Sequence, residues 1–488
     1  MKYFIILSIA ALMCSNAYPQ GYANTWVFGD SAGLNFNVSP PESFESTILT
    51  NEAGACISDI YGNLLFYSNG EKVWNRNNEI MPNGNELNLG GITAYGSSYT
   101  QGVIILPIPL NSDKYYVFYL TGYLIPEDNF GVEYSIVDMA LDSGKGDVTE
   151  KNIDLFIEPT TEKLQAVKHA NGRDWWLIFR MENIVLSESQ FVRFLITPEG
   201  IEGPYYQPYG AENEWTYSNF GFYGEMVFSP QGDKLAYTAG TNLDIYNFDR
   251  CTGELSDVHT IYNIDPVLTY GCSFSPDGNN IFVSSGCGGN NNLFQYCLKC
   301  KESIETTEVN LYHNSGSYCL GQMELGSDGK IYVAVGYNEL PNDIFNIKNQ
   351  NLSVINSPNE LGLACDFDTN TVSLGDRRVI YGLPNMPNYN LGALTGSECD
   401  TLTSVIQSIE SNTISIYPNP ANEYIIISGD INANDLLKIY SADGRVVLQE
   451  KIYTTNTKVD ISKLPSGVYV IQIIEDGWVK YSEKLLKE

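Results

Sequence analysis

Short alternations of hydrophobic and polar residues, separated by turn-forming sequences, run through most of this chain. The clearest example is Phe274–Ser284, in which a Pro-Asp-Gly turn centred on Asp277 separates two apolar runs. Proline fixes φ, aspartate bonds back to the backbone, and glycine takes the positive φ of a tight turn. Apolar runs on both sides of such a turn predict a β-hairpin.

The same hairpin pattern recurs along the chain at intervals of 46 to 60 residues, with turns near Gly62, Asp113, Gly172, Gly232, Gly278 and Gly329. A period of this length suits one four-stranded blade of a β-propeller per repeat. In the fourth repeat we expect the strands at 224–229, 234–238, 243–248 and 258–261.

Closure of the ring is predicted from the two ends of the repeat region. Near the amino terminus, Thr25–Phe28 and Gly33–Phe36 are strand-like but have no inner strand before them. At the other end, Tyr381–Pro387 has the pattern of an inner strand with no successor. An open ring would leave two bare sheet edges, so we expect these segments to build a shared seventh blade.

The first 17 residues have the features of a signal peptide. Lys2 supplies the positive start, residues 3–13 the apolar core, and Ser15–Ala17 a small-residue cleavage site. Cys14 leaves a lipoprotein anchor as the alternative, although Met13 is larger than the usual residue before such a cysteine. No other apolar run approaches the ~18 residues that span a bilayer. We therefore expect a mature chain without a transmembrane segment, beyond the cytoplasmic membrane.

A second domain follows the repeats. Residues 391–412 are rich in Gly, Ser, Thr and Glu and are expected to form a linker. Residues 413–488 contain seven short strand patterns, which favour a β-sandwich. The predicted fold class is therefore all-β, with a seven-bladed β-propeller at 18–390 followed by a small Ig-like β-sandwich at 413–488.

Four motifs occupy the second domain in a fixed order: Tyr417–Ala421, Ile439–Arg445, Val459–Tyr469 and Lys484–Lys487. With these motifs the domain closely resembles the carboxyl-terminal sorting domain of the type IX secretion system. The resemblance assigns the sorting motif to Tyr417, Pro418, Asn419, Pro420, Gly444, Gly467, Lys484 and Lys487. It implies the type IX secretion machinery as a partner, export across the outer membrane, and then removal of the domain with release or surface attachment.

The body carries its own set of motifs: Trp26–Gly29, Ala32–Phe36, Val73–Arg76, His169–Trp176, Phe248–Gly253 and Tyr381–Pro384. Through these, residues 24–390 resemble secreted propeller proteins of Bacteroidota-type bacteria. The resemblance implies the fold but no known activity, so it supplies no catalytic residue, cofactor or metal.

The charge of the chain narrows the classes of partner. It has 58 acidic and 27 basic residues, a net charge of −31, and residues 18–412 hold 48 of the acidic and 18 of the basic side chains. An acidic body repels nucleic acid and anionic lipid, so neither is expected as a partner.

Ten cysteines are present, and five of them lie between Cys272 and Cys319. Cys297 and Cys300 have the spacing of zinc ligands, but no second pair completes a site. Disulfides of an oxidising compartment, or small buried residues, explain these cysteines better.

Candidate chemistry is sparse. His169 lies beside a turn, His259 on an outer strand and His313 in a connection, which favours structural roles. A Ser-His-Asp arrangement stays open, although no Gly-x-Ser-x-Gly elbow is present. Asp366–Asn370 alternates oxygen ligands as a calcium loop does, but it lacks the glycine and the distant glutamate. An outer strand with solvent-facing aspartates is the preferred interpretation.

Two features could form a functional site. The acidic residues Glu52, Glu162, Glu225 and Glu324 lie near the entrances of inner strands. If paired in the central funnel, such carboxylates would suit glycoside hydrolysis. The other feature is the long loop 203–223, which holds eight aromatic residues.

Polar and acidic neighbours surround Trp215 and Tyr217 in this loop, so we expect these two to contribute to a shallow ligand-binding surface. Tyr205, Tyr206 and Phe222 are expected to pack the loop onto its blades. The leading hypothesis is a secreted or cell-surface binding module, without cofactor, for an extracellular glycan or protein. The alternative is a polysaccharide-acting enzyme with carboxylates in the propeller funnel.

Overall fold

The computed structural model divides into two compact units, Met1–Asp400 and Thr401–Glu488, and each is described by itself. The described residues are 21–52, 54–87, 90, 92–93, 96–121, 131–183, 188–208, 222–264, 268–285, 291–316, 318–337, 345–400, 414–429, 431–432, 435–441, 446–454, 456–475 and 478–487.

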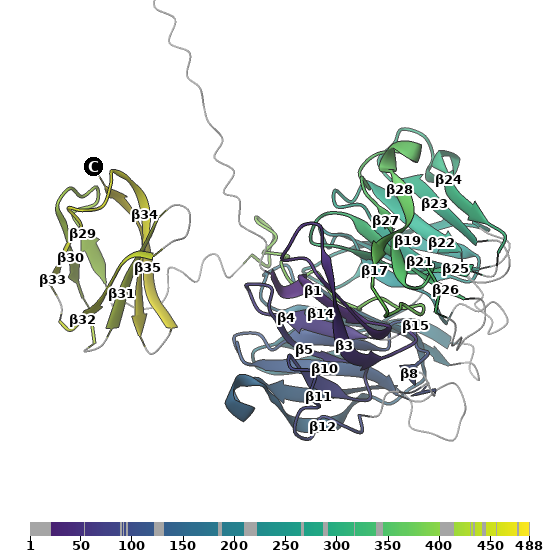
Figure 1. Ribbon diagram of the computed structural model, residues 1–488, viewed down its shortest axis with the longest axis horizontal. Coiled ribbons are helices and arrows are strands. Elements are labelled where there is room, and N and C mark those ends of the chain that lie inside the picture. Colours follow the sequence, from purple (N-terminus) through teal and green to yellow (C-terminus); the bar gives the residue numbers. More distant parts are fainter. Residues whose placement is uncertain are drawn as a thin grey trace, which may run out of the picture. The chain divides into compact units, whose positions relative to one another are not determined.

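Seven antiparallel sheets of three or four strands follow one another along the described part of the first unit (Figure 1). The first two are β1 (Thr25–Phe28), β2 (Asp30–Asn35) and β3 (Glu42–Leu49), then β4 (Ala55–Ser58), β5 (Leu64–Ser68) and β6 (Val73–Asn75). The third and fourth are β9 (Val103–Pro107), β10 (Lys114–Thr121), β11 (Gly131–Asp138) and β12 (Asp147–Phe156), then β13 (Thr160–Lys168), β14 (Trp175–Asn183), β15 (Glu188–Thr197) and β16 (Gly200–Pro208).

The fifth and sixth sheets are β17 (Met226–Phe228), β18 (Lys234–Ala239), β19 (Asn242–Phe248) and β20 (Leu255–Ile261), then β21 (Thr269–Phe274), β22 (Asn280–Ser285), β23 (Asn291–Cys297) and β24 (Val309–Asn314). The seventh is β25 (Tyr318–Leu325), β26 (Ile331–Tyr337), β27 (Asn351–Ile355) and β28 (Phe367–Ser373). Smaller elements are β7 (Ile92–Thr93), β8 (Gly96–Ser97) and the 3-10 turns η1 (Gly21–Ala23), η2 (Asp142–Gly144), η4 (Ile304–Thr307) and η5 (Gly362–Cys365).

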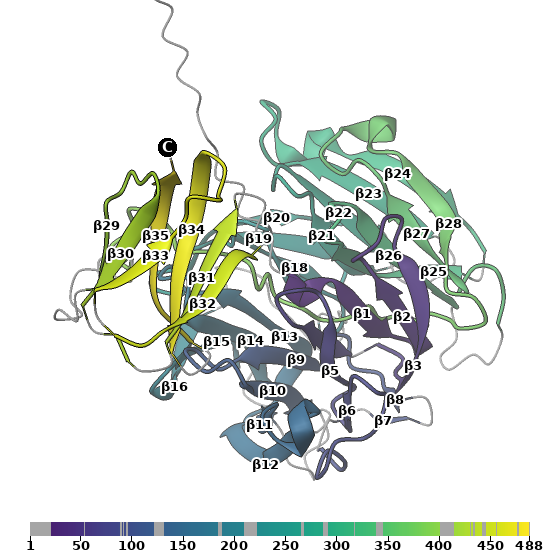
Figure 2. The same cartoon turned by 60° about the vertical axis from the view of Figure 1, so that its left-hand side comes forward.

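The sheets surround a common centre, as two views of the ribbon show (Figure 1, Figure 2). Backbone hydrogen bonds join successive inner segments: Glu52 to Ser97, Gln101 to Glu162, Glu162 to Phe222, Glu225 to Tyr270, Gln322 to Tyr381, and Tyr381 to Asn51. Between the remaining two segments, the Ser284 hydroxyl accepts from the amide of Gly271 and donates to the carbonyl of Gly321. The fold is a seven-bladed β-propeller, as the sequence predicted.

The carboxyl-terminal segment of the first unit takes the seventh place in this ring. Tyr381 lies between Gln322 of β25 and Asn51, and its backbone bonds to both. The segment is not a regular strand, because Pro384 and Pro387 lack the N–H groups that a ladder needs. Its one strand-like pairing with the amino-terminal sheet, among the described residues, is the bridge between Asp30 and Arg378.

The predicted hairpin turns are present. Gly62, Gly172, Gly232, Gly278 and Gly329 each have positive φ and donate a turn hydrogen bond to the residue three positions earlier. In the turn near Asp113, Leu110 takes the positive φ instead. Glycine adopts this conformation without the clash of a Cβ, which is why the sequence signal was readable.

Irregular pairing marks the outer rim of the propeller. In six of the seven sheets the outermost pair of strands contains at least one register shift: β2–β3, β11–β12, β15–β16, β19–β20, β23–β24 and β27–β28. Each shift leaves one or two extra residues on one strand, which interrupt the regular ladder of hydrogen bonds.

Some local expectations are corrected by the structure. His313 lies in strand β24 rather than in a connection. Strand β16 extends to Pro208, so Tyr205 and Tyr206 belong to an outer strand and not to a loop. Asp366 precedes β28, and Asp368 is exposed on that strand, in agreement with the preferred interpretation of an outer strand.

The second unit is a sandwich of two sheets. One contains β29 (Ser415–Tyr417), β30 (Tyr424–Ser428) and β33 (Thr457–Asp460), and the other contains β31 (Asp435–Ser441), β32 (Val446–Ile452), β34 (Gly467–Glu475) and β35 (Trp478–Lys487). Alternate residues point inward and form a separate apolar core that includes Ile425, Leu437, Ile471 and Leu485. Seven strands were predicted here, and seven are present among the described residues.

Candidate functional site

The centre of the propeller is filled by polar side chains. Five residues from different inner segments meet there and are almost completely buried: Gln101, Gln165, Glu225, Gln322 and Asn385. We call these five residues the channel plug. Their hydrogen bonds run from one inner segment to another, so they join the blades to one another.

Asn385 makes the most connections in the plug. Its amide nitrogen donates to the carbonyls of Val103, at 3.0 Å, and Leu164, at 2.8 Å, which belong to β9 and β13. Its carbonyl oxygen accepts from the Gln165 amide at 3.1 Å, and its backbone N–H donates to Gly54 at 2.7 Å. One side chain from the carboxyl-terminal segment thus ties several blades together.

Glu225 links three inner strands within the plug. Its carboxylate oxygen Oε2 accepts the backbone N–H of Cys272 at 2.7 Å and that of Met323 at 3.1 Å. Burial raises the pKa of Glu225 to about 8, against the opposing effect of these two hydrogen bonds and of the nearby Lys163 ammonium. Lys163 is itself fully buried, donates to the carbonyl of Thr238 and lies 3.6 Å above the Tyr237 ring.

A second acidic group lies where the inner segments enter the ring. Glu162 accepts from the backbone N–H and the hydroxyl of Thr100 at 3.2 and 3.1 Å, and burial raises the pKa of Glu162 to about 7. Burial and the charge of Glu162 raise the pKa of Glu52 well above its ordinary value, while hydrogen bonds from Tyr270 and Thr100 act against this rise. The two carboxyl groups therefore share Thr100 as a partner.

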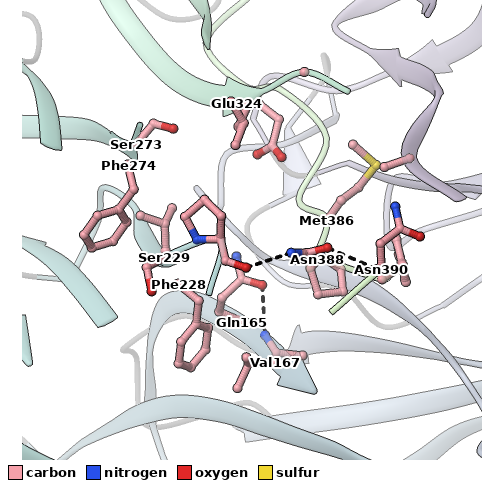
Figure 3. A pocket seen from close by; sticks show the side chains of 18 of the residues that line it. Gln165, Val167, Phe228, Ser229, Ser273, Phe274, Glu324, Met386, Asn388 and Asn390 are labelled. Atoms are coloured by element: carbon pink, nitrogen blue, oxygen red, sulfur yellow. Dashed lines mark hydrogen bonds between the residues drawn. The ribbon is translucent and has the colours of Figure 1, made fainter. Parts of the chain in front are cut away.

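A cavity of about 210 Å³ opens at the other end of the plug, where the inner strands turn into the second strands. Its lining comes from β13, β17, β21 and β25 and from the carboxyl-terminal residues 386–390. Apolar groups of Phe228, Phe274 and Met386 form walls, and the polar side chains of Gln165 and Glu324 reach into the space (Figure 3). The cavity is smaller than the ~300–1,000 Å³ typical of drug-sized ligands.

The electrostatics of this cavity follow from the one carboxyl group in its lining, that of Glu324. Burial, and to a lesser degree the neighbouring Glu225 carboxylate, raise the pKa of Glu324 well above its ordinary value. A protonated Glu324 can donate as well as accept a hydrogen bond. No lysine or arginine is among the described residues that line the cavity. The cavity therefore suits hydroxyl or amide groups better than an anion.

The structure does not test the two residues that the sequence predicted to bind ligand. Trp215 and Tyr217 lie outside the described residues. Tyr205 packs on the ring of Trp176 at 6.2 Å, and Tyr206 on Phe156 at 6.4 Å, so both contact the face of their own or the adjacent blade as expected. All four acidic residues singled out in the sequence lie around the plug: Glu52, Glu162 and Glu225 are buried, and Glu324 lines the cavity.

The cavity itself was missed, although a signal for it exists. The recurring Phe-Ser-Pro sequence places Phe228, Ser229 and Pro230 in its wall, and Phe274 comes from the next copy. The hairpin motif that identified the blades therefore also lines the cavity. The contribution of residues 386–390 could not be foreseen, because it depends on where the chain runs after closing the ring.

Cysteines are paired at two places in the described chain. Cys297 bonds to Cys300, and Cys251 bonds to Cys399, with Cα atoms 5.6 Å apart in each pair. Cys319 is also disulfide-bonded, and Cys56, Cys272 and Cys365 are free and buried. The expected disulfides are therefore present, together with small buried cysteines.

One cluster of metal-ligating side chains occurs among the described residues, formed by His169, Cys251 and Cys399. Its two sulfurs are bonded to each other, so a thiolate site would require reduction. Both ring nitrogens of His169 are also engaged, Nε2 with the carbonyl of Cys251 and Nδ1 with the backbone N–H of Asn171. These contacts give His169 a structural role.

Most of the sorting-motif residues lie at one edge of the second unit. Asn419 donates to the carbonyl of Lys484 and accepts from the backbone N–H of Leu486, so it holds the loop of Tyr417, Pro418 and Pro420 against β35. Gly467 begins β34 and pairs with Lys487, which ends β35. Gly444 lies outside the described residues.

Comparison with known proteins identifies the second unit. Residues 415–488 match the family model of the secretion system C-terminal sorting domain. This domain directs export through the type IX machinery to the outer surface or the extracellular space. In the described part of the chain no helix is long and apolar enough to cross a membrane.

The first unit is similar in fold to solved structures at low sequence identity. The periplasmic gluconolactonase of Pseudomonas aeruginosa is 11% identical, with a TM-score of 0.37, and the match covers 75% of this chain and 89% of that one. A Lactobacillus plantarum protein is 11% identical, with a TM-score of 0.36 and coverages of 81% and 93%. A putative 6-phosphogluconolactonase of Bacteroides fragilis is 11% identical, with a TM-score of 0.32 and coverages of 77% and 96%. No curated protein matches the chain.

Proposed function

We propose that this type IX-exported propeller is a binding module that takes a small uncharged polar group, such as the terminal sugar of a glycan, into the cavity below the channel plug. The observation that carries the proposal is the combination of apolar walls at Phe228 and Phe274 with convergent polar groups at Gln165 and Glu324. Aromatic and aliphatic surface suits the C–H faces of a sugar ring, and amide or carboxyl groups suit its hydroxyls.

The charge of the protein supports an uncharged ligand. The body carries a large excess of acidic residues, which repels anions, and the described residues that line the cavity include no lysine or arginine to bind one. The volume of about 210 Å³ favours a single ring over an extended chain. An exported protein meets glycans of this kind outside the cell.

A glycan array probed with the purified mature protein, followed by calorimetry on the best ligand, tests the proposal. Ser273 lines the cavity and is buried, so Ser273→Leu should fill part of the space and weaken binding by about tenfold or more. Ser112→Leu, on an exposed turn of the third blade, is the matched control and should bind normally. If both variants bind with equal affinity and have normal melting temperatures, the binding site lies outside this cavity.

Trp215 and Tyr217 are proposed to form a separate shallow surface for the same class of ligand. Replacing each by Ala should weaken binding while the melting temperature stays within a few degrees, because exposed side chains contribute under ~0.5 kcal/mol to stability. A loss of several kcal/mol would instead indicate that they are packed in the core.

A second candidate function is the hydrolysis of a glycosidic bond, and one observation favours it. Glu52 and Glu162 share a partner, and a pKa of about 7 for Glu162 suits a general acid. Burial argues against it, since Glu52 and Glu162 are both shielded from solvent and a polysaccharide could not reach them without rearrangement. Release of reducing ends from a polysaccharide panel, lost in Glu162→Gln with binding retained, would establish the enzyme. Absence of release, or equal release by the variant, would exclude this pair.

A further inference from the structure

After closing the ring and lining the cavity, the chain crosses the outside of the propeller as a strap, residues 390–400. The strap has no regular secondary structure, and all of its residues are exposed or half-buried. Arg250 donates to the carbonyl of Gly392, and the backbone N–H of Leu394 donates to the carbonyl of Ala170. At its end, the disulfide between Cys399 and Cys251 fixes the strap to the turn between β19 and β20.

Upstream of the strap and the cavity wall lies the segment that completes the ring, residues 379–385, which we call the seam segment. Its backbone N–H groups donate four hydrogen bonds to backbone carbonyls: from Val379 to Asn349 at 2.8 Å, from Tyr381 and Gly382 to Asn51 at 2.9 and 3.1 Å, and from Asn385 to Gly54 at 2.7 Å. Its departure would remove Asn385 from the plug and open the ring between β25 and Asn51.

The chain beyond the strap connects the propeller to the sorting domain, so it transmits any force that acts on that domain. Residue 401 begins the second unit, which carries the sorting domain, and Cys399 is the last residue of the described propeller that is bound covalently to another part of it. Any pull on the sorting domain during export is transmitted through Cys399. Without a covalent anchor, the pull would first peel the strap, and would then load Tyr389, whose buried hydroxyl bonds to the carbonyl of Ile105 at 2.8 Å. Beyond Tyr389 it would reach the seam segment.

We propose that the Cys251–Cys399 disulfide is a latch that protects the closure of the ring from force and fraying at the sorting-domain end. The disulfide diverts a pull on the linker into the β19–β20 turn of the fifth sheet, so the seam segment carries none of it. It also limits the free length of a detached strap, because a chain fixed at both ends stays near its binding site. Residues 251 and 399 are 148 positions apart, so the latch joins the end of the strap to a distant blade.

Hydrogen exchange of the full mature chain, resolved by peptide, tests the latch. In Cys251→Ser/Cys399→Ser we expect the amides of the seam segment and of the strap to exchange about tenfold faster or more, with β14 unchanged. The matched control is Cys297→Ser/Cys300→Ser, which removes a disulfide whose cysteines are three positions apart and which lies away from the seam. The control should leave exchange in the seam segment as in the wild type.

Unchanged exchange in the seam segment of the latch variant would overturn the proposal, and so would equal acceleration in all blades, which would indicate a general loss of stability. If the double serine variant fails to fold, the folded wild type is reduced under native conditions, and peptide mapping after alkylation selects conditions in which Cys251–Cys399 opens while the Cys319 disulfide stays intact. Faster exchange confined to the seam segment and the strap would then support the latch, and the same two contrary results would overturn it. Neither result depends on whether the cavity binds a sugar.

Discussion

Replacing Asn385 by Ala tests whether the channel plug holds the blades together. The substitution removes two hydrogen bonds to the carbonyls of Val103 and Leu164, one from the Gln165 amide and a longer one, of 3.5 Å, from the Gln101 amide, all in a site with 4% residual exposure. Each buried hydrogen bond contributes about 1 kcal/mol net, and each buried partner left unsatisfied costs about 1–3 kcal/mol. We expect the free energy of unfolding to fall by about 3–5 kcal/mol, a large share of the ~5–15 kcal/mol of a typical domain.

Urea denaturation followed by tryptophan fluorescence measures this change, since five of the six tryptophans belong to the first unit. Asn388→Ala is the control: Asn388 is exposed, and its side chain bonds only to backbone groups of Pro230 and Asn390 that water can also satisfy, so the loss should be under about 1 kcal/mol. Asn385→Asp adds a sharper test, because its carboxylate would face two carbonyl oxygens. It should be more destabilising at high pH, where it is charged. A loss under about 1 kcal/mol for Asn385→Ala, with an unchanged denaturant slope, would refute the assigned role.

Three further predictions concern the ring, its acidic residues and export. A Cβ on Gly382 would lie 1.9 Å from the carbonyl oxygen of Glu52, whereas a Cβ on Gly392 would meet nothing within 4 Å. Gly382→Ala should therefore lower the melting temperature strongly, and Gly392→Ala should leave it unchanged. Burial raises the pKa of Glu225 to about 8, so its contribution to stability is complete below the unfolded pKa and is lost as the pH rises through 8. In urea titrations between pH 5 and 8, the free energy of unfolding of the wild type should fall by up to about 1.4 kcal/mol per pH unit relative to that of Glu225→Gln. Parallel plots of unfolding free energy against pH for the two proteins would contradict this. Deletion of residues 413–488 should leave a folded propeller in the periplasm, and cell fractionation that finds it outside the cell at normal levels would exclude the sorting role.

The blades and the sorting domain could be predicted because local chemistry determines them. Each hairpin turn has a residue with positive φ between two segments in which apolar and polar residues alternate. A turn such as that at Gly232 or Gly278 therefore indicates a blade even when the positions of the other blades are unknown. The export route was likewise readable from contiguous motifs, such as the Tyr417–Ala421 segment that the Asn419 side chain fixes to β35.

The plug, the cavity wall and the latch could not be predicted, because each depends on residues far apart in the chain. Asn385 meets Val103 and Leu164 only after seven segments have closed into a ring. Cys251 and Cys399 are separated by 148 positions, and the spacing of the ten cysteines gives no rule for pairing them. Sequence suggested that acidic side chains gather at the centre, but not that amides would close the passage between them.

The bulges at the outer rim affect how exported molecules associate with one another. The last strand of a blade exposes unpaired N–H and C=O groups, and a flat edge of this kind would let neighbouring molecules join into a continuous sheet. The register shifts in six outermost pairs bend these strands and interrupt the regular spacing that a second molecule would need. Exported copies of the protein can therefore remain separate molecules.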